Sequence, residues 1–167
     1  MIMVLPILQN PHPLLRPRAD PVTNPNDPAV RRLVADMIDT MHAEEGVGLA
    51  ANQVGSLLRI AVIGIDKEKP LALINPKILR YSWRKVPSEE GCLSVKGTYV
   101  KIRRAKSIKV QALSWEGKEL LFTAKDFLAT VIQHEVDHLN GVLIIDKAPN
   151  YKSQITNNDQ NTKSQIV

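Results

Sequence analysis

Apolar residues recur at spacings of three and four through one stretch near the start of the chain, and this periodicity predicts an amphipathic helix. Asp27 followed by Pro28 supplies an N-cap and a first-turn proline, and the helix is expected to end before Gly46. Its apolar positions are Val30, Leu33, Val34, Met37, Ile38 and Met41. Seven of the eleven prolines lie in the first 28 residues, so an extended arm that wraps the domain is expected before the helix.

Branched apolar residues predict strands in the middle of the chain. The predicted strands cover residues 59–65, 71–74, 106–114 and 120–122. A polar segment at residues 66–70 separates the first two strands, and Glu116 with Gly117 forms the expected turn between the last two. Because strands and helices do not alternate regularly, the pattern indicates an α+β fold rather than a doubly wound sheet.

A second stretch with helical spacing carries the strongest chemical signal. Thr123 is positioned to cap a helix that runs to about Asn140. Within it, His134, Glu135 and His138 form an H-E-x-x-H motif, whose spacing places both imidazoles on one face of the helix. Two surface histidines are the ordinary alternative, but the apolar neighbours favour a buried metal site. Glu135 is then suited to act as a general base on water.

A catalytic metal site of this type needs a third protein ligand, and the sequence limits the choice. A metzincin would have a histidine where this chain has Ile144. The residues after His138 are few and strand-like, with Asp146 the only nearby acid, so a thermolysin-like carboxylate on a following helix is not expected. Cys92, preceded by the flexible Gly91, offers a soft thiol, although a lone cysteine is more often a buried structural residue.

Glycine and alanine dominate residues 46–53, which end in the amide side chain of Gln53. Such small residues let the backbone pass close to a ligand. The G-x-G start is similar to a dinucleotide-binding loop, but no strand precedes it and no third glycine follows at the required spacing. Taken alone, the segment predicts a tight connection between a helix and a strand.

Composition narrows the class of protein. The 167 residues, 44% hydrophobic and 23% charged, are typical of one soluble globular domain. The single cysteine excludes an intrachain disulfide and favours a reducing compartment. No signal peptide or membrane-spanning stretch is evident, so we expect a cytoplasmic protein without membrane contact. The net charge of +5 permits contact with RNA, but no specific DNA binding is expected.

Three segments, residues 46–53, 90–94 and 134–138, resemble the three signature motifs of the peptide deformylases in order and separation. The resemblance also covers the arm at residues 7–16, and it extends over roughly residues 5–148. It implies antiparallel sheets packed around a central H-E-x-x-H helix. It also implies a hydrolase that removes the formyl group from the N-terminal formyl-methionine of newly made polypeptides and releases formate.

The resemblance assigns roles to individual residues. The implied metal ligands are Cys92, His134 and His138. They would hold one Fe2+ ion, for which Zn2+, Ni2+ or Co2+ can substitute. Glu135 would take a proton from water and return it to the leaving amine, while Gln53 and the Leu93 N–H hold the oxyanion. The implied substrate-binding residues are Val47, Gly48, Gly91, Phe127, Thr130 and Val131, the side chains among them forming an apolar pocket for methionine.

The chain departs from the family pattern in two places. After Ser94, many relatives read hydrophobic-Pro-Gly where this chain has Val95-Lys96-Gly97, which is expected to loosen the loop beside the peptide groove. Many relatives also end in a basic helical tail that docks on the ribosome. Residues 151–167 contain two lysines as their only cations, so docking through the tail is not expected and a transient ribosome contact stays open.

Domain boundaries and rival functions complete the expectations. Residues 1–148 are expected to form the catalytic domain, and residues 149–167 a polar, flexible tail. The alternatives are a related metallopeptidase, an N-deacylase for another acyl group, and a ribosome- or RNA-binding protein in which the histidines are only structural. An organellar location follows only if a transit peptide has been removed.

Overall fold

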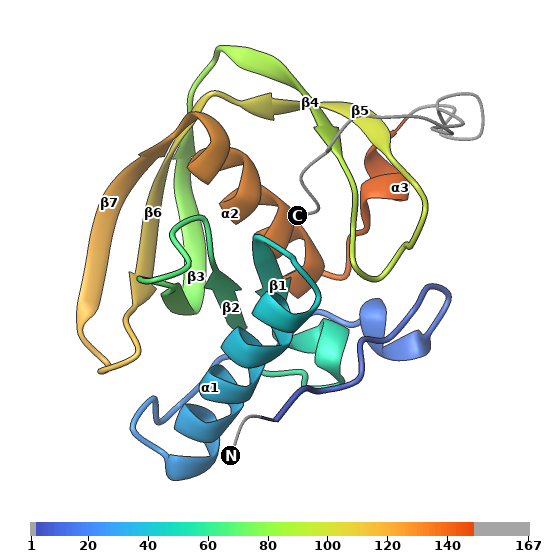
Figure 1. Ribbon diagram of the computed structural model, residues 1–167. Coiled ribbons are helices and arrows are strands. Elements are labelled where there is room, and N and C mark those ends of the chain that lie inside the picture. The colour runs from blue at the N-terminus through green and yellow to red at the C-terminus, as the bar shows by residue number, and fades with distance from the viewer. Residues whose placement is uncertain (1–2, 149–167) are drawn as a thin grey trace.

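Helices and strands are mixed along residues 3–148, which are the residues that the computed structural model describes (Figure 1). The helices are α1 (Pro28–Ala43), α2 (Asp126–Leu139) and α3 (Ile144–Lys147), and the 3₁₀ turns are η1 (Pro13–Leu15) and η2 (Ala51–Val54). The strands are β1 (Gly48–Ala50), β2 (Ile60–Ile63), β3 (Leu71–Tyr81), β4 (Lys85–Glu90), β5 (Val100–Ala105), β6 (Ser107–Leu113) and β7 (Glu119–Lys125). The predicted tail, residues 149–167, lies outside the described residues.

A five-stranded antiparallel sheet, in the order β1-β2-β3-β6-β7, forms most of the framework, and β4 and β5 form a separate antiparallel pair. Helix α2 packs against strands of both sheets, and Figure 1 shows it between them. Its apolar side shares a core with inward residues of the large sheet, including Leu73, Val110 and Ala124. The predicted α+β fold with a central H-E-x-x-H helix is confirmed.

Local sequence signals account for α1. The Asp27 carboxylate accepts a hydrogen bond from the Ala29 N–H at 2.8 Å, and Pro28 occupies the first turn. Further along the helix, Met37 and Met41 are fully buried in a core shared with β1 and β2. The helix therefore begins at the predicted position, and it ends at Ala43, before Gly46 as predicted.

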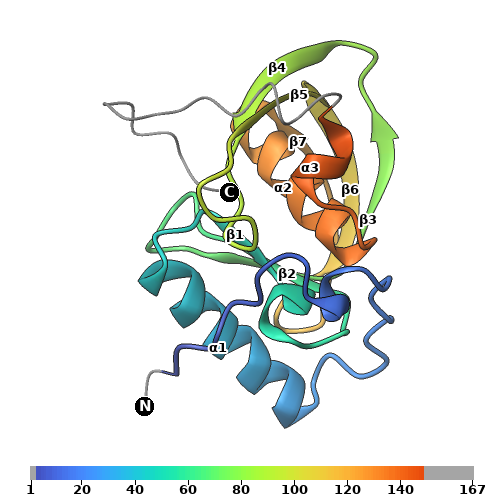
Figure 2. The ribbon, with the colours of Figure 1, turned by 90° about the vertical axis from the view of Figure 1, so that its right-hand side faces the viewer.

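The N-terminal arm joins three segments that are distant in the sequence. Its backbone N–H groups donate to carbonyl groups in all three, Leu8 to Gln53, Asn10 to Ser94 and Ala19 to Leu139, at 2.8–2.9 Å. Figure 2 shows the arm passing along η2 at one end of the molecule. The predicted wrapping arm is confirmed, and it holds two of the motif-bearing loops against the C-terminal end of α2.

The predicted start of the second helix is wrong. Thr123 lies within β7, and α2 begins at Asp126. Strands β6 and β7 stay paired as far as Ser107 and Lys125, so the sheet continues through the position where a cap was expected. Sheet pairing has overridden the local capping signal.

The sequence predicted a strand-like segment after His138, and this prediction is wrong. Residues 144–147 form the helix α3. The Asp146 carboxylate accepts the Leu143 N–H at 2.8 Å and pairs with Arg16 at 2.6 Å, so it is engaged in fixing this helix. Other differences are additions: β3 continues to Tyr81, β4 and β5 were not predicted, and the tight connection contains β1 and η2. Within residues 3–148, no helix is long and apolar enough to cross a membrane.

Candidate metal centre

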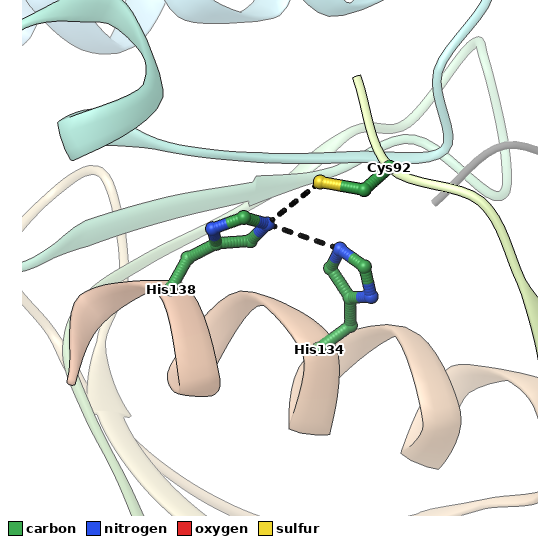
Figure 3. Close-up of side chains that lie close together, drawn as sticks. All are labelled: Cys92, His134 and His138. Atoms are coloured by element: carbon green, nitrogen blue, oxygen red, sulfur yellow. Dashed lines mark hydrogen bonds between the residues drawn. The ribbon is translucent and has the colours of Figure 1, made fainter. Parts of the chain in front are cut away.

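Three ligand atoms converge where the loop after β4 passes over α2. Sγ of Cys92 lies 3.2 Å from Nε2 of His138, which in turn lies 3.1 Å from Nε2 of His134 (Figure 3). The three atoms lie within 4.8 Å of one another, and each residue is at most 3% exposed. The structure therefore brings the three predicted ligands together from a loop and one helix face.

The outer nitrogen of His134 contacts a buried ion pair. Its Nδ1 lies 2.9 Å from Oε2 of Glu90, whose two oxygens accept 2.8 Å hydrogen bonds from Nε and Nη2 of Arg104. Arg104 also pairs with Asp137, the residue before His138 in the motif. Because the carboxylate accepts the Nδ1–H, the proton stays on Nδ1 and Nε2 presents its lone pair to the cluster.

Glu90 and Arg104 stabilise each other as charged groups. Burial alone would raise the pKa of Glu90, but the hydrogen bonds from Arg104 and His134 outweigh it and hold the pKa at about 2. Burial alone would lower the pKa of Arg104, and contact with Glu90 and Asp137 raises it above its ordinary value. The carboxylate beside His134 is therefore ionised over the whole neutral range.

Glu135 has the opposite surroundings. It is 1% exposed, and neither carboxylate oxygen has a hydrogen-bond partner among the described residues. The carboxylate lies against Gly48, where a Cβ would overlap Oε1 and touch Val131. Burial, reinforced by the negative charge of Glu90, raises the pKa of Glu135 well above its ordinary value. An unpaired carboxyl group is thus held beside the ligand cluster, and a glycine makes room for it.

The donor set fits a divalent cation. Burial raises the pKa of the Cys92 thiol to about 12 and lowers that of His138 well below its ordinary value, so the protein alone leaves both groups neutral. A neutral imidazole is the ligand form of histidine, and a bound cation deprotonates a coordinating thiol. Ligand atoms roughly 2.0–2.3 Å from one ion would lie somewhat over 3 Å apart, as the atoms of His134 and His138 do here.

Gln53 is brought to the same place by η2. Its Oε1 accepts the Ala50 N–H at 2.8 Å, which turns Nε2 toward Ser94 Oγ at 3.1 Å and Cys92 Sγ at 3.8 Å. Leu93 follows the ligand, and among residues 3–148 its backbone N–H donates to no protein acceptor. The amide of Gln53 and the free N–H of Leu93 therefore both lie next to Cys92.

The predicted substrate-binding residues fall into two groups. Val47 and Phe127, both partly buried, pack against the cluster that contains Val131, and Thr130 is buried on the same helix. Gly91 lies instead on the loop side, where a Cβ would meet the ring of Tyr99. A hollow of about 130 Å³, lined partly by residues 91–93 and 95–99, opens there beside the ligand cluster.

Sequence reasoning gave no role to three residues of the site. Glu90 begins the second motif segment and Asn52 lies within the first, but neither was assigned a role, and Arg104 lies in a segment with no recognised function. Asn52 Nδ2 donates to the His138 carbonyl at 2.6 Å and ties η2 to the end of α2. One signal could have found Arg104: Val100, Ile102 and Arg104 alternate along β5, so the arginine occupies an inward position.

The comparisons with known proteins agree on one family. A model of the polypeptide deformylase family matches residues 4–154. A peptide deformylase of Syntrophomonas wolfei is 47% identical over 145 residues, 87% of this chain and 93% of the relative, and one of Rhizobium meliloti is 44% identical over 147 residues, 86% and 84%. The crystal structure of the Ehrlichia chaffeensis peptide deformylase in complex with actinonin has a TM-score of 0.86 at 40% identity, covering 90% of this chain and 92% of that one. The chain belongs to the peptide deformylase family.

Membership of the family gives the activity. The enzyme is a metal-dependent hydrolase that removes the N-formyl group from newly made polypeptides. The resemblance inferred from the three motifs is confirmed, and the match covers all of them. The relatives give no support to a peptidase, a deacylase for another acyl group or an RNA-binding protein with a purely structural site.

Proposed function

We propose that Cys92, His134 and His138 hold one Fe2+ ion in this deformylase. The observation that carries the proposal is the convergence of their three ligand atoms within 4.8 Å in a buried site. One thiolate and two imidazoles suit Fe2+, and the same set accepts Zn2+, Ni2+ or Co2+. When bound, such an ion would act as a Lewis acid, polarising a carbonyl group and lowering the pKa of a bound water.

Glu135 is the proton carrier in this proposal. Glu135 follows the candidate ligand His134 directly in the sequence. Its two oxygens accept no hydrogen bond from residues 3–148, so the carboxylate is free to accept a proton from the attacking water. The same carboxyl group then donates that proton to the nitrogen of the leaving amine. Its close approach to Gly48 limits the number of positions it can occupy.

Gln53 and Leu93 are the proposed donors to the formyl oxygen. As negative charge develops on that oxygen, the Gln53 Nε2–H and the Leu93 N–H stabilise it by hydrogen bonding. The Ala50 N–H fixes the Gln53 amide through its other end, and this support is set before the substrate arrives. Such preorganised donors need no rearrangement during the reaction.

The methionine side chain of the substrate is proposed to enter the apolar region that contains Val47, Phe127 and Val131, with Thr130 beside it. Support comes from packing: Val47 and Phe127, both partly buried, pack against the core that contains the buried Val131. Backbone groups near Gly48 and Gly91 would align the peptide from two sides. The close packing around Glu135 favours a formyl carbon, which carries only hydrogen, over bulkier acyl groups.

The proposal is tested with substrate and metal together. Protein prepared without oxygen and loaded with one equivalent of Fe2+ should release formate from formyl-Met-Ala-Ser much faster than acetate from the acetyl peptide. Removal of the ion with a chelator should abolish release, and Fe2+, Ni2+ or Co2+ should restore it. Actinonin, bound by the Ehrlichia chaffeensis relative, should inhibit the restored enzyme. Full activity in metal-free protein would contradict the proposed centre.

The setting of the reaction is also a proposal. We place the enzyme in the cytoplasm, with residues 1–148 as the catalytic domain and residues 149–167 as an appended tail. A transient contact with the ribosome would bring the metal centre close to its substrate, since newly made polypeptides emerge from the ribosome. Co-sedimentation of the enzyme with ribosomes tests this contact.

A further inference from the structure

The large sheet has a second face that no described helix covers. Helix α2 lies on one side of β3, β6 and β7, and Figure 1 shows no helix on the other side. Five exposed cations gather there or at the adjoining β3–β4 turn: Lys77, Arg80, Arg84, Lys109 and Lys125. Within residues 3–148, none of the five forms an ion pair with an acidic side chain. In the part of the chain that the structure describes, the same face carries one exposed acid, Glu119 at the far end of β7, so its net charge is positive.

Two of these cations are placed unfavourably for the isolated protein. Arg80 and Lys109 are directly opposite each other in the β3–β6 register, so they project from the same face of the sheet. Like charges at such cross-strand positions destabilise a sheet. On its other side, Lys109 pairs with Thr123 of β7, and the threonine side chain carries no negative charge. An anion bound between the two cations would relieve their repulsion.

An exposed tryptophan stands beside these cations. Trp83, in the turn between β3 and β4, is 93% exposed although a large aromatic surface usually finds a partner. The turn itself is well fixed: Ser82 N–H donates to the Ser107 carbonyl at 2.9 Å, Ser107 N–H to Ser82 Oγ at 3.1 Å, and Ser82 Oγ to the Arg84 carbonyl at 2.9 Å. The indole is therefore an exposed aromatic surface on a rigid support.

The tryptophan and four of the five cations, all but Lys77, line two adjoining hollows, which together are called the groove. A hollow of about 510 Å³ is lined by residues that include Arg80, Trp83 and Lys109. A second hollow of about 340 Å³ is lined by residues that include Arg84, Lys106 and Lys125. It also contains one acid, Asp126, whose Oδ1 lies 3.7 Å from Nζ of Lys106. Ser82 and Ser107 line both hollows, so the two adjoin at these residues.

We propose that this groove binds a single-stranded segment of RNA, with its phosphates on Arg80 and Lys109 and one base stacked on Trp83. Cations that contact phosphates and an aromatic ring that stacks with a base are the two elements by which proteins hold single strands. A flat bilayer cannot fill a concave groove, and an acidic peptide makes no comparable use of the indole. The choice of RNA rests on the proposed contact with the ribosome, because the ribosome exposes RNA where new polypeptides emerge. It adds a binding surface and a ligand to that proposed contact.

Binding of a labelled 12-nucleotide oligouridine to the full chain tests the groove. Arg80→Gln/Lys109→Gln should weaken binding about 10-fold and reduce the slope of log affinity against log salt by about 1.4, the value for two lost phosphate contacts. Lys67→Gln/Lys69→Gln removes the same charge from the turn before β3, at the other end of that strand, and should leave the slope unchanged. Trp83→Ala should weaken binding at least roughly 5-fold.

Controls separate RNA from other anions and the groove from the metal centre. A 12-base-pair RNA duplex, polyglutamate and vesicles of anionic lipid should all bind more weakly than oligouridine. Equal binding of any of these, or equal affinity of the groove variants and the unaltered chain, would overturn the proposal. All variants should still release formate from a free formyl peptide at the unaltered rate, which keeps this test independent of the metal centre. Ribosome co-sedimentation that survives both groove variants would place the ribosome contact elsewhere and overturn this use of the groove.

Discussion

Glu90 and Glu135 are buried in the same centre, but the two sides on which they lie treat a carboxylate in opposite ways. On the β4–β5 side, Arg104 donates two hydrogen bonds to Glu90 and holds its pKa at about 2. On the β1 side, no described residue donates to Glu135, and burial raises its pKa. Two carboxyl groups whose surroundings separate their pKa values have different tasks. In the proposed mechanism, the paired group orients the candidate ligand His134 and the unpaired group moves a proton.

The largest expected effect separates these tasks most directly. Glu135→Gln should lower the rate of formate release about 10³-fold, within the range for loss of a general base, because an amide cannot accept the proton from water. Bound metal should stay at one equivalent, since the three ligands are untouched. Turnover and metal content measured on the same preparation check both statements. Loss of the ion from this variant would make Glu135 a ligand and remove the distinction between the two sides.

A glycine substitution sharpens the same point without changing the carboxyl group. A Cβ at position 48 would overlap Oε1 of Glu135, so Gly48→Ala should displace the carboxylate. A misplacement of about 1 Å in a reacting group lowers the rate on the order of 10²-fold. Because the clash acts through Glu135, the double variant with Glu135→Gln should be no slower than Glu135→Gln alone. Additive losses in this cycle would show that Gly48 acts through another contact.

Removing the paired carboxylate should affect binding and stability more than chemistry. Glu90→Gln leaves Arg104 buried with Asp137 as its remaining acidic partner, and breaking such a pair costs about 3–5 kcal/mol in the free energy of unfolding. Metal affinity should fall about 10- to 100-fold, because the second nitrogen of His134 loses its acceptor. Denaturant unfolding and metal competition measure these effects. Glu89→Gln, at the exposed neighbouring position, is the control and should change stability by less than about 0.5 kcal/mol.

The contrast also explains which parts the sequence could predict. Helix α1 was predicted because its cap at Asp27 and its apolar periodicity are local signals. The proximity of His134 and His138 on α2 was predicted because helical geometry relates positions four residues apart. Glu90 and Arg104 pair across β4 and β5, and no local spacing relates two residues on strands whose pairing was itself unpredicted.

The errors have the same origin. Thr123 has the chemistry of a helix cap, but pairing of β7 with β6 occupies its backbone, and the helix starts later. Propensity acts over one turn, whereas the sheet sums contributions from a whole strand pair. Conversely, the groove around Trp83 could not be predicted from the sequence, because Arg80 becomes a neighbour of Lys109 only through the pairing of β3 with β6.

The smallest expected effect is in acid, and it tests the paired side alone. In the unfolded chain Glu90 takes up its proton near the ordinary pKa of 4.5, whereas the folded protein resists protonation down to about pH 2. Between these values the unfolded state binds more protons, so stability from this group is complete above pH 4.5 and is lost as the pH falls toward 2. The total is roughly 3 kcal/mol, at 1.36 kcal/mol for each unit of pKa.

Metal-free protein isolates this contribution from acid release of the ion. The free energy of unfolding should fall more steeply between pH 5 and 2 in the unaltered chain than in Glu90→Gln, which has no carboxyl group to titrate at that position. The two curves should therefore converge as the pH falls. Parallel curves would show that Glu90 is no better stabilised as an anion in the folded state than in water. The pairing with Arg104 would then not distinguish this side of the centre from the side of Glu135.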